Sequence, residues 1–250
     1  MLPSLLTNHR YEVRFALSAA DICSAQRLRY AVFNLEMGIG LETSAATGLD
    51  ADAFDETCEH LMVIERESGD VVGTYRMRTG LRALECDGYY SERQFEFAPY
   101  AQRRASILEL GRACVRKDHR SFAVIGLLWR GIVDYATAHK CRYLVGCSSV
   151  SSQDPALAWA MYRRFERENQ VASPEWLTVP RPAYAMPPAE PLAHCPSVPR
   201  LLAAYLGVGA RICAPPALDR EFGTIVFLTM LDCLGSTPSA GRFLDNTKAA

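Results

Sequence analysis

The stretch ILELGRACVRKDHRSFAVIGLLW, residues 107–129, decides the fold. Its first nine residues, ILELGRACV, are rich in apolar side chains and predict a strand, and after a short basic turn the apolar segment 122–139 predicts a helix. A strand buried on both faces is usually almost continuously apolar. Glu109 and Arg112 interrupt this one, and buried charges are costly unless they are paired or used. They therefore indicate either a structural ion pair or a functional site on the central strand.

The composition is that of an ordinary soluble globular protein. The 250 residues are 49% hydrophobic and 22% charged, with a formal net charge of −1. This balance argues against bulk binding of nucleic acid. The N-terminus lacks the charged region of a signal peptide, and no run reaches the roughly 18 apolar residues of a spanning helix. We expect a cytoplasmic protein.

The nine cysteines do not indicate a metal site. No pair has the CxxC spacing, the number is odd, and the five histidines show no ligand spacing with them. We therefore expect buried, reduced thiols and no metal.

The order of predicted elements is that of a mixed α/β chain with an antiparallel first half and a βαβ crossover in the middle. One domain is expected over residues 1–250, with a core at about 10–234 and a flexible tail at 235–250. The remaining predicted strands are 10–17, 60–66, 71–77, 142–147, 211–214 and 224–231, and the remaining helices are about 19–33, 92–97, 155–167 and 198–206. A polar loop is expected at 148–153.

Several charged residues of the first half lie on these elements. Arg29 and Phe33 are four residues apart and share one face of the first helix. A long loop, 36–59, carries Asp52 and Asp55, and Arg76 lies in the second strand of the hairpin. By themselves, these residues are more typical of ordinary structural roles: Arg29 of a solvated surface arginine, Phe33 of a core aromatic, and Asp52 and Asp55 of a solvated acidic loop. The loop lacks the glycine and terminal glutamate of a calcium site.

Taken in order, seven short segments of the chain resemble the L-ornithine Nα-acyltransferases, enzymes of ornithine lipid synthesis related to acyl-homoserine-lactone synthases. The segments are LRYAVF, FDETCEHLMVI, VVGTYRMR, YYSERQFEF, ELGRACVRKDHR, LLWRGI and AAYLGVGARICAPPALDREFGT, and the resemblance covers about 11–232. Lactone synthases usually carry a tryptophan shortly after the first-helix phenylalanine. The corresponding EMGI, 36–39, has none, which favours the ornithine enzymes.

The resemblance implies a GCN5-related N-acyltransferase (GNAT) fold, a mixed and mostly antiparallel sheet flanked by helices. It also implies transfer of a (3-hydroxy)fatty acyl group from acyl carrier protein to the α-amine of ornithine. The donor substrate is then the phosphopantetheine thioester of the carrier, and no cofactor is expected. The alternatives are another amino acid acceptor, a lactone-synthase-like enzyme, or a binding protein that kept the fold without catalysis.

The resemblance also implies roles for the charged residues. Glu109 and Arg112 become catalytic candidates, with Glu109 either the base for the amine or a group that only orients it. Residues three apart in a strand face opposite sides, so a bulge is expected near 110–112, with Gly111 a suitable place. The expected amino acid site is formed by Arg29, Phe33, Asp52, Asp55 and Arg76.

The turn before the second long helix is the expected carrier site. It lacks the glycines that wrap a pyrophosphate, which is compatible with the single phosphate of a carrier. Arg116, Lys117, Arg120 and Ser121 are the predicted contacts, and their charge would steer an acidic carrier. An ordinary solvated turn is the alternative. Because the product enters the bilayer, peripheral contact with the inner membrane face is compatible with this function.

Overall fold

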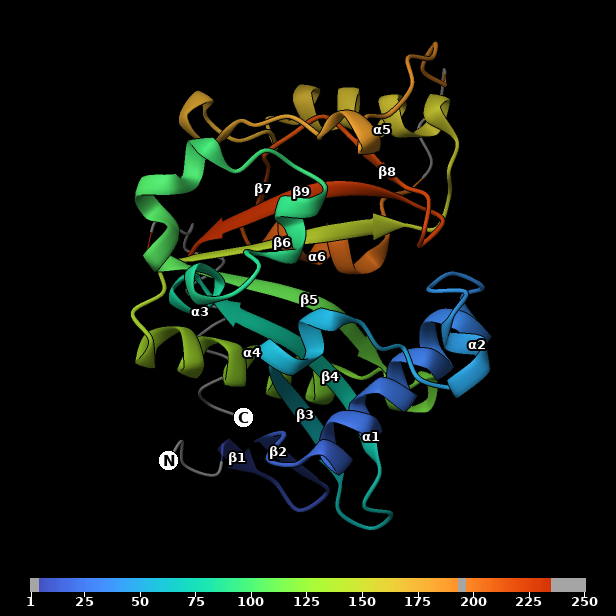
Figure 1. Cartoon of the computed structure of the whole chain (residues 1–250), viewed down its shortest axis with the longest axis vertical. Helices are drawn as coiled ribbons and strands as arrows, with labels where there is room; N and C mark the ends of the chain where they lie inside the picture. Colours follow the sequence, from blue (N-terminus) through green and yellow to red (C-terminus); the bar gives the residue numbers. More distant parts are fainter. Residues whose placement is uncertain (1–4, 193–196, 235–250) are drawn as a thin grey trace. The chain divides into compact units, whose positions relative to one another are not determined.

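The computed structural model describes residues 5–192 and 197–234, and it contains two compact units (Figure 1). Among the described residues, the first unit comprises 5–78 and 110–141, and the second comprises 79–109, 142–192 and 197–234. Strand β5 (Ile107–Val115) begins in the second unit and ends in the first. The predicted tail, 235–250, lies outside the described residues. A single acyltransferase domain stays a prediction.

The first unit is built on antiparallel strands. They are β1 (Leu5–Thr7), β2 (Tyr11–Phe15), β3 (Glu59–Glu65) and β4 (Val71–Thr79). Each pairs with the next, and Leu61 stands opposite both Phe15 and Tyr75. The turn between β3 and β4 contains Gly69 with a φ of 74°, a conformation that glycine adopts without steric cost. This confirms the predicted hairpin.

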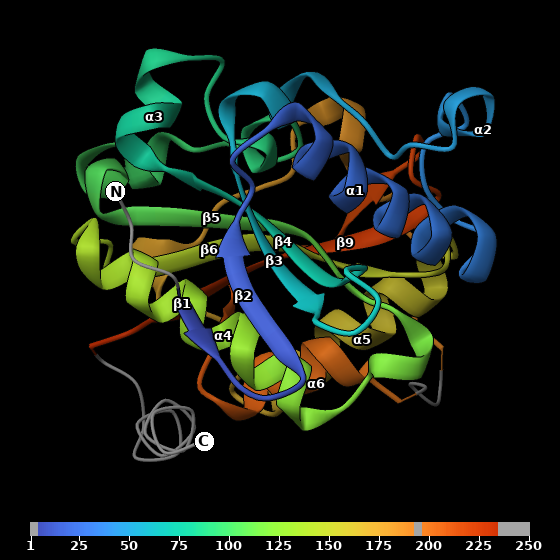
Figure 2. The same ribbon diagram turned by 90° about the horizontal axis from the view of Figure 1, so that it is seen from below.

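Helices and short helical turns complete the first unit. They are α1 (Ala19–Tyr30), the π-helix η1 (Ala31–Glu36), α2 (Ser44–Thr47), α4 (Phe122–Ala138), and the 3-10 helices η2 (Ala53–Thr57) and η5 (Lys117–His119). Helix α4 runs along β2 and β3 (Figure 2). A Cβ atom on Gly131 of α4 would lie only 2.9 Å from Leu61, so glycine permits this close approach. Since side chains alternate along a strand, His60 beside Leu61 points to the opposite face.

The second unit contains both parallel and antiparallel pairs. Its strands are the start of β5, β6 (Tyr143–Val150), β7 (Arg211–Ile212), β8 (Ala217–Asp219) and β9 (Thr224–Asp232). Strands β5 and β6 are parallel, with Glu109 opposite Val145, whereas β6, β7 and β8 are antiparallel to β9. The parallel pair confirms the predicted crossover topology, and the mixed, mostly antiparallel strand pairing confirms the predicted fold class.

The second unit contains buried clusters of aromatic and aliphatic side chains together with several helices. The helices are α3 (Gly80–Glu85), α5 (Pro155–Arg167), α6 (Arg200–Gly207), and the 3-10 helices η3 (Tyr90–Arg93), η4 (Ala98–Ser106), η6 (Pro174–Trp176) and η7 (Pro182–Tyr184). Asp154 caps α5 and Pro155 occupies its first turn, as predicted. Across the described part of the chain, no helix is both long and apolar enough to span a membrane.

Two predictions of local structure were wrong, and two short strands, β1 and β8, were not predicted. Strand β6 continues through the expected polar loop to Val150, because Ser148 pairs with Phe227 and its hydroxyl lies 2.7 Å from that of Thr229. Strand β8 has only three residues, too few for a periodic signal. The short helix expected at 92–97 is the 3-10 turn η3, two residues earlier.

Two of the cysteines expected to be buried thiols are Cys114 and Cys213. Neither forms a disulfide, and both are more than nine-tenths buried. Burial raises the pKa of both thiols to about 12, because the charged thiolate is poorly solvated there. Both are therefore protonated at neutral pH.

Candidate active site

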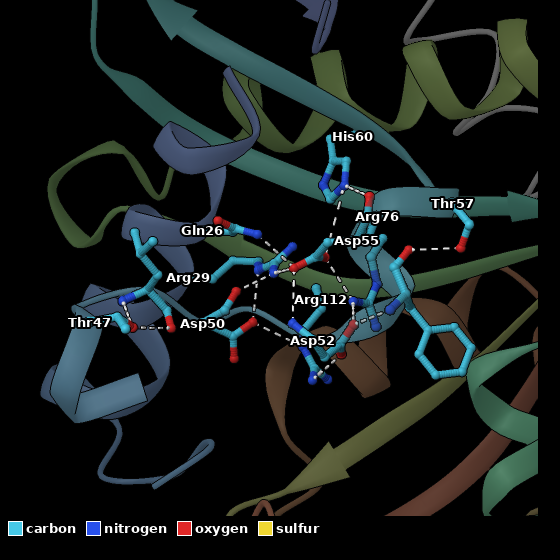
Figure 3. A network of polar contacts seen from close by, with 12 residues as sticks. Gln26, Arg29, Thr47, Asp50, Asp52, Asp55, Thr57, His60, Arg76 and Arg112 are labelled. Atoms are coloured by element: carbon cyan, nitrogen blue, oxygen red, sulfur yellow. Dashed lines mark hydrogen bonds and ion pairs between the residues drawn. The ribbon is translucent and has the colours of Figure 1, made fainter. Parts of the chain in front are cut away.

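Six charged side chains of the first unit meet in one ionic cluster (Figure 3). They come from helix α1, the loop that precedes and includes η2, and strands β4 and β5. The members are Arg29, Asp50, Asp52, Asp55, Arg76 and Arg112. Five of the seven residues predicted from sequence to bind or act on the amino acid thus lie together.

Arg29 occupies the buried end of this ionic cluster. Its side chain is fully buried, its Nε donates to Asp50 Oδ1 at 2.8 Å, and its Nη2 donates to Asp55 Oδ2 at 2.7 Å. The same Nη2 donates to the backbone carbonyl of Asp50. Gln26, one turn earlier on α1, adds a hydrogen bond of 2.9 Å to Asp55 Oδ2. These bonds fix the loop against α1.

Asp52 lies at the opposite, more exposed end of the ionic cluster. It is the N-cap of η2, accepting from Phe54 N at 2.9 Å, which is the usual role of an aspartate before a helix. Its carboxylate also accepts hydrogen bonds from Arg76 Nη1 at 2.5 Å and from Arg112 Nη2 at 2.9 Å. The Asp52 side chain is 13% exposed and that of Arg112 7%, against 4% or less for the other four members.

The charges of the ionic cluster are balanced, with three guanidinium and three carboxylate groups. Burial raises the pKa of Asp55, but Arg29 and Arg76 lower it more, and the pKa lies well below its usual range. The pKa of Asp52 is lowered in the same way by Arg76 and Arg112, against the effect of burial. Both aspartates are therefore ionised at neutral pH.

Three buried polar atoms beside these bonds have no hydrogen-bond partner within the described chain. They are Arg29 Nη1, Asp50 Oδ2 and His60 Nδ1. His60 Nε2 lies 3.0 Å from the carbonyl oxygen of Asp55, to which it can only donate, so Nδ1 is left as an acceptor. Burial lowers the pKa of His60, which keeps the ring neutral. Within the described chain, the ionic cluster and the adjacent His60 thus keep one donor and two acceptors for further polar contacts.

Arg112 has an irregular backbone conformation within strand β5, inside the segment 110–112 where a bulge was expected. Its φ is 49°, in the left-handed region that costs a non-glycine residue about 1–2 kcal/mol. The irregularity falls on Arg112 itself, whereas Gly111 was the expected position. The side chain explains this, because Nε donates to Asp50 Oδ1 at 3.1 Å and Nη2 donates to Asp52. Two charge-assisted hydrogen bonds offset the backbone cost.

Glu109 belongs to the second unit, where it caps the 3-10 helix η3. Its Oε1 accepts from Ser91 N at 2.7 Å and from Ser91 Oγ at 2.5 Å, and its Oε2 accepts from Tyr90 N at 2.8 Å. The residue is 6% exposed. A carboxylate has about four acceptor positions. At least three are used by these donors, so the orientation of Glu109 is fixed.

Phe33 lies in the π-helix η1 and packs on a small apolar core. That core is formed by Leu28, Val32 and Cys114, with Val71 beside it. This is the environment of a core aromatic, one of the two readings that the sequence left open. A role of Phe33 in binding the substrate stays a prediction.

The residues of the predicted carrier turn have carboxylate partners of their own. Arg116 contacts Asp70 and Asp118 at 2.9 Å each, and Arg120 holds both oxygens of Glu36 at 2.6 and 2.8 Å. Lys117 is exposed. The turn is therefore less positive than its sequence suggests.

Ser121 is the N-cap of α4. Its side chain is exposed and makes no capping hydrogen bond. The hydroxyl is therefore oriented by neither the turn nor the helix.

Sequence reasoning missed Gln26, His60 and the capping groups of Glu109, and it gave Asp50 no role. Gln26 lies three residues before Arg29 on the same helix face, which could have indicated a shared partner. Nothing in the sequence connects Ser91 with Glu109, because a 3-10 turn has no periodic signal. In the described residues, no group of three or more His, Cys, Asp and Glu side chains could hold a metal ion.

Comparison with known proteins identifies a matching family model and similar acyltransferases. The family model described as acetyltransferase (GNAT) domain matches residues 28–130. An L-ornithine N(alpha)-acyltransferase of Brucella abortus (strain 2308) is 36% identical, with 85% of this chain and 81% of that protein covered. One of Rhodobacter capsulatus is 32% identical, with 89% of this chain and 90% of that protein covered.

Among solved structures, the ternary complex of TofI with an inhibitor and MTA is similar in fold. The TM-score is 0.53 at 18% sequence identity, over 94% of this chain and 96% of TofI. This similarity supports the GNAT-like fold.

Proposed function

The chain belongs to the L-ornithine N(alpha)-acyltransferase family, and we propose that it transfers a fatty acyl group from a thioester to the α-amine of ornithine. The chain is an acyltransferase with a GNAT domain. The observation that carries the proposal is the similarity to ornithine acyltransferases along 85% of the chain or more. The buried charges at Glu109 and in the ionic cluster support it, since an ordinary strand would not keep them.

The reaction is a direct acyl transfer. The neutral amine attacks the thioester carbonyl carbon, a carbon–nitrogen bond forms and the carbon–sulfur bond breaks. One amine proton leaves, and the thiolate takes up a proton to become the carrier thiol. The products are an N-acyl amino acid and a free thiol.

Glu109 is proposed to orient the attacking amine. Its carboxylate is held in place by Tyr90 N, Ser91 N and Ser91 Oγ. A pre-oriented acceptor can align an amine with the thioester, and this alignment can supply much of the rate enhancement. Because several donors already bind the Glu109 carboxylate, its bonding favours orientation of the amine over direct proton abstraction. The amine proton would then leave through water.

Arg112 and Asp52 are proposed to face the amino acid. They are the two most exposed members of the ionic cluster. A guanidinium suits the α-carboxylate of ornithine, and a carboxylate suits its side-chain ammonium. Arg29, Asp55 and Arg76 lie deeper and would hold these two groups in position.

The donor is proposed to be an acyl carrier protein, with its phosphate at the first turn of α4. The exposed Lys117 and Ser121 support this assignment, because a helix N-terminus and a lysine are both typical phosphate ligands. Arg116 and Arg120 would contribute only as parts of existing ion pairs. Since an acylated amino acid is amphiphilic, peripheral contact with a membrane is part of this proposal.

A thiol-release assay tests the proposal. The protein is mixed with 3-hydroxyacyl carrier protein and ornithine, beside other amino acids, acyl-CoA and S-adenosylmethionine. Release that depends on ornithine and is lost in Glu109→Gln is the expected result. Release with another amino acid would identify an N-acyl amino acid synthase, and methylthioadenosine formation would identify a lactone synthase. No release with any amine, with carrier binding retained, would refute catalysis.

A further inference from the structure

A second buried carboxylate in the second unit, Asp219 at the end of β8, has no role in the reaction proposed above. It is 4% exposed and accepts from two neutral donors, Gln94 Nε2 at 2.6 Å and Phe222 N at 2.9 Å. In the described part of the chain, it forms no ion pair. Burying a carboxylate without a cation is costly, so its position calls for a reason.

One of the two bonds has a structural explanation. Phe222 N closes the turn between β8 and β9 onto Asp219 Oδ1, and Gly223 with a φ of 69° completes that turn. An aspartate that accepts from a backbone N–H shortly after it is common in such turns. The bond from Gln94 to Oδ2 is not needed for the hairpin, and it joins residues far apart in the chain.

The amide of Gln94 has a single possible orientation. Because the Asp219 carboxylate can only accept, Gln94 must present its NH2 group to Asp219 and its Oε1 to the other side. There the Cys147 thiol on β6 donates to Oε1 over 3.4 Å. Gln94 is 2% exposed, so solvent does not compete for these bonds.

Gln94 is also bonded to Ser91, the residue that donates two hydrogen bonds to Glu109. Gln94 N donates to the Ser91 carbonyl at 3.1 Å, and Phe95 N donates to the same oxygen at 2.9 Å. Ser91 in turn gives its N–H and its hydroxyl to Glu109. The short segment from Tyr90 to Gln94 is therefore held at its start by Glu109 and at its end by Asp219.

We propose that Gln94 and Asp219 are positioning residues for Glu109, acting through Ser91. The inference rests on the proposed function, in which Glu109 orients the amine. The Gln94–Asp219 bond fixes the end of η3, which fixes the two Ser91 donors and hence the direction of the Glu109 carboxylate. Accurate placement of the Glu109 carboxylate requires that the Ser91 donors are themselves held rigidly, and the Gln94–Asp219 bond provides this.

Substitutions at Gln94 test this without breaking the β8–β9 turn. Gln94→Met keeps the volume and removes both side-chain bonds. We expect kcat with ornithine to fall about tenfold, the scale of a geometric misplacement, with the KM for the acyl donor unchanged. Gln170→Met is the matched control, because Gln170 is a half-buried glutamine of the same unit whose Oε1 makes no hydrogen bond within the described chain.

In Gln94→Glu, the pH dependence of kcat distinguishes a positioning role from a purely structural one. The substitution sets two carboxylates face to face, and such a pair retains a shared proton only at lower pH. Besides Asp219, the titratable group that contacts the Gln94 side chain is the Cys147 thiol on β6. The charged residues next to these positions are Arg93 and Glu96 along the segment, Arg220 beside Asp219, and Arg181, whose N–H donates to the Gln94 carbonyl. We expect the kcat ratio of Gln94→Glu to wild type to fall about tenfold between pH 6 and pH 9.

The outcomes separate this inference from the proposed function. If the wild-type protein gives no ornithine-dependent release, the proposed function fails. If wild type is active and Glu109→Gln is not, while Gln94→Met has wild-type kcat, the positioning role is refuted. A Gln94→Glu ratio that stays constant with pH also refutes it. Loss of activity with a matching loss of thermal stability in Gln94→Met, but no pH effect in Gln94→Glu, would identify a purely structural bond.

Discussion

Arg29 and Arg112 donate to the same oxygen of Asp50, Oδ1, at 2.8 and 3.1 Å. One arginine comes from α1 and the other from β5, so a single carboxylate oxygen joins two elements that are distant in the chain. The carboxylate lies between two buried guanidinium groups and reduces the repulsion between them. The geometry of the ionic cluster therefore depends strongly on Asp50.

Asp50→Asn should destabilise the protein strongly. The amide keeps the shape but removes the charge that two buried arginines require, and breaking a buried ion pair typically costs about 3–5 kcal/mol. Urea unfolding followed by circular dichroism measures the loss. Asp118→Asn is the control, because the Asp118 side chain is 65% exposed and its pair with Arg116 should contribute little. Equal effects of the two substitutions would contradict the assignment.

Arg112→Lys should reduce kcat/KM for ornithine about tenfold or more while the fold is retained. A lysine ammonium has no planar fork, so it cannot span Asp50 and Asp52 as the guanidinium does. Steady-state kinetics with varied ornithine measures the change. Arg167→Lys, at an exposed position on α5, should behave as wild type. Full activity of Arg112→Lys would exclude a bidentate role for Arg112.

The aspartates of the ionic cluster should make stability depend on acid pH. The pKa of Asp52 and that of Asp55 are lower in the folded protein than in the unfolded chain. Their contribution is therefore fully present above the unfolded pKa of about 3.9 and is lost as the pH falls toward the folded values. Between pH 6 and 8 their contribution to the free energy of unfolding should therefore not change with pH.

Unfolding of wild type and Asp52→Asn between pH 2 and 7 checks this. The variant lacks one of the titrating groups, so its stability should decrease less steeply below pH 5. Parallel curves for the two proteins would show that Asp52 is not held ionised by Arg76 and Arg112.

Substitutions at Glu109 and Ser91 should separate orientation from folding. In Glu109→Gln the amide NH2 faces one of the donors Tyr90 N or Ser91 N, and we expect kcat to fall at least about a hundredfold. Ser91→Ala removes only one of three donors and should lower kcat about tenfold. If both variants retain the wild-type kcat, Glu109 does not contribute to the reaction.

Lys117→Glu should affect only the donor. It reverses an exposed charge at the proposed carrier site, so the KM for acyl carrier protein should rise a few-fold at low salt, and less at high salt. The KM for ornithine should stay constant. Lys140→Glu, an exposed lysine just after α4, is the matched control. Identical effects of the two substitutions would show that Lys117 is not part of the carrier site.

The sequence predicted the ionic cluster better than it predicted the surroundings of Glu109. Arg29, Asp52, Asp55, Arg76 and Arg112 could be selected because each is a charge within an apolar or lid-like segment and the family pattern connects them. That Glu109 caps η3 could not be predicted, because a 3-10 helix of four residues gives no periodic sequence pattern. The positive charge of the basic turn was overestimated, since Arg116 pairs with the neighbouring Asp118 and with the distant Asp70, and Arg120 pairs with the distant Glu36.

By itself, the sequence determined the order of the longer strands and helices, without the short strands β1 and β8, as well as the mixed sheet and the acyltransferase family. These depend on periodicity, capping residues and local motifs, which are readable within short windows. Only the tertiary structure decided which charges are paired, that Arg112 rather than Gly111 takes the left-handed backbone, and that Glu109 and Asp219 hold opposite ends of one short segment. The physical reason is that an ion pair or a cap joins residues from distant parts of the chain, and its geometry exists only once those parts are folded together.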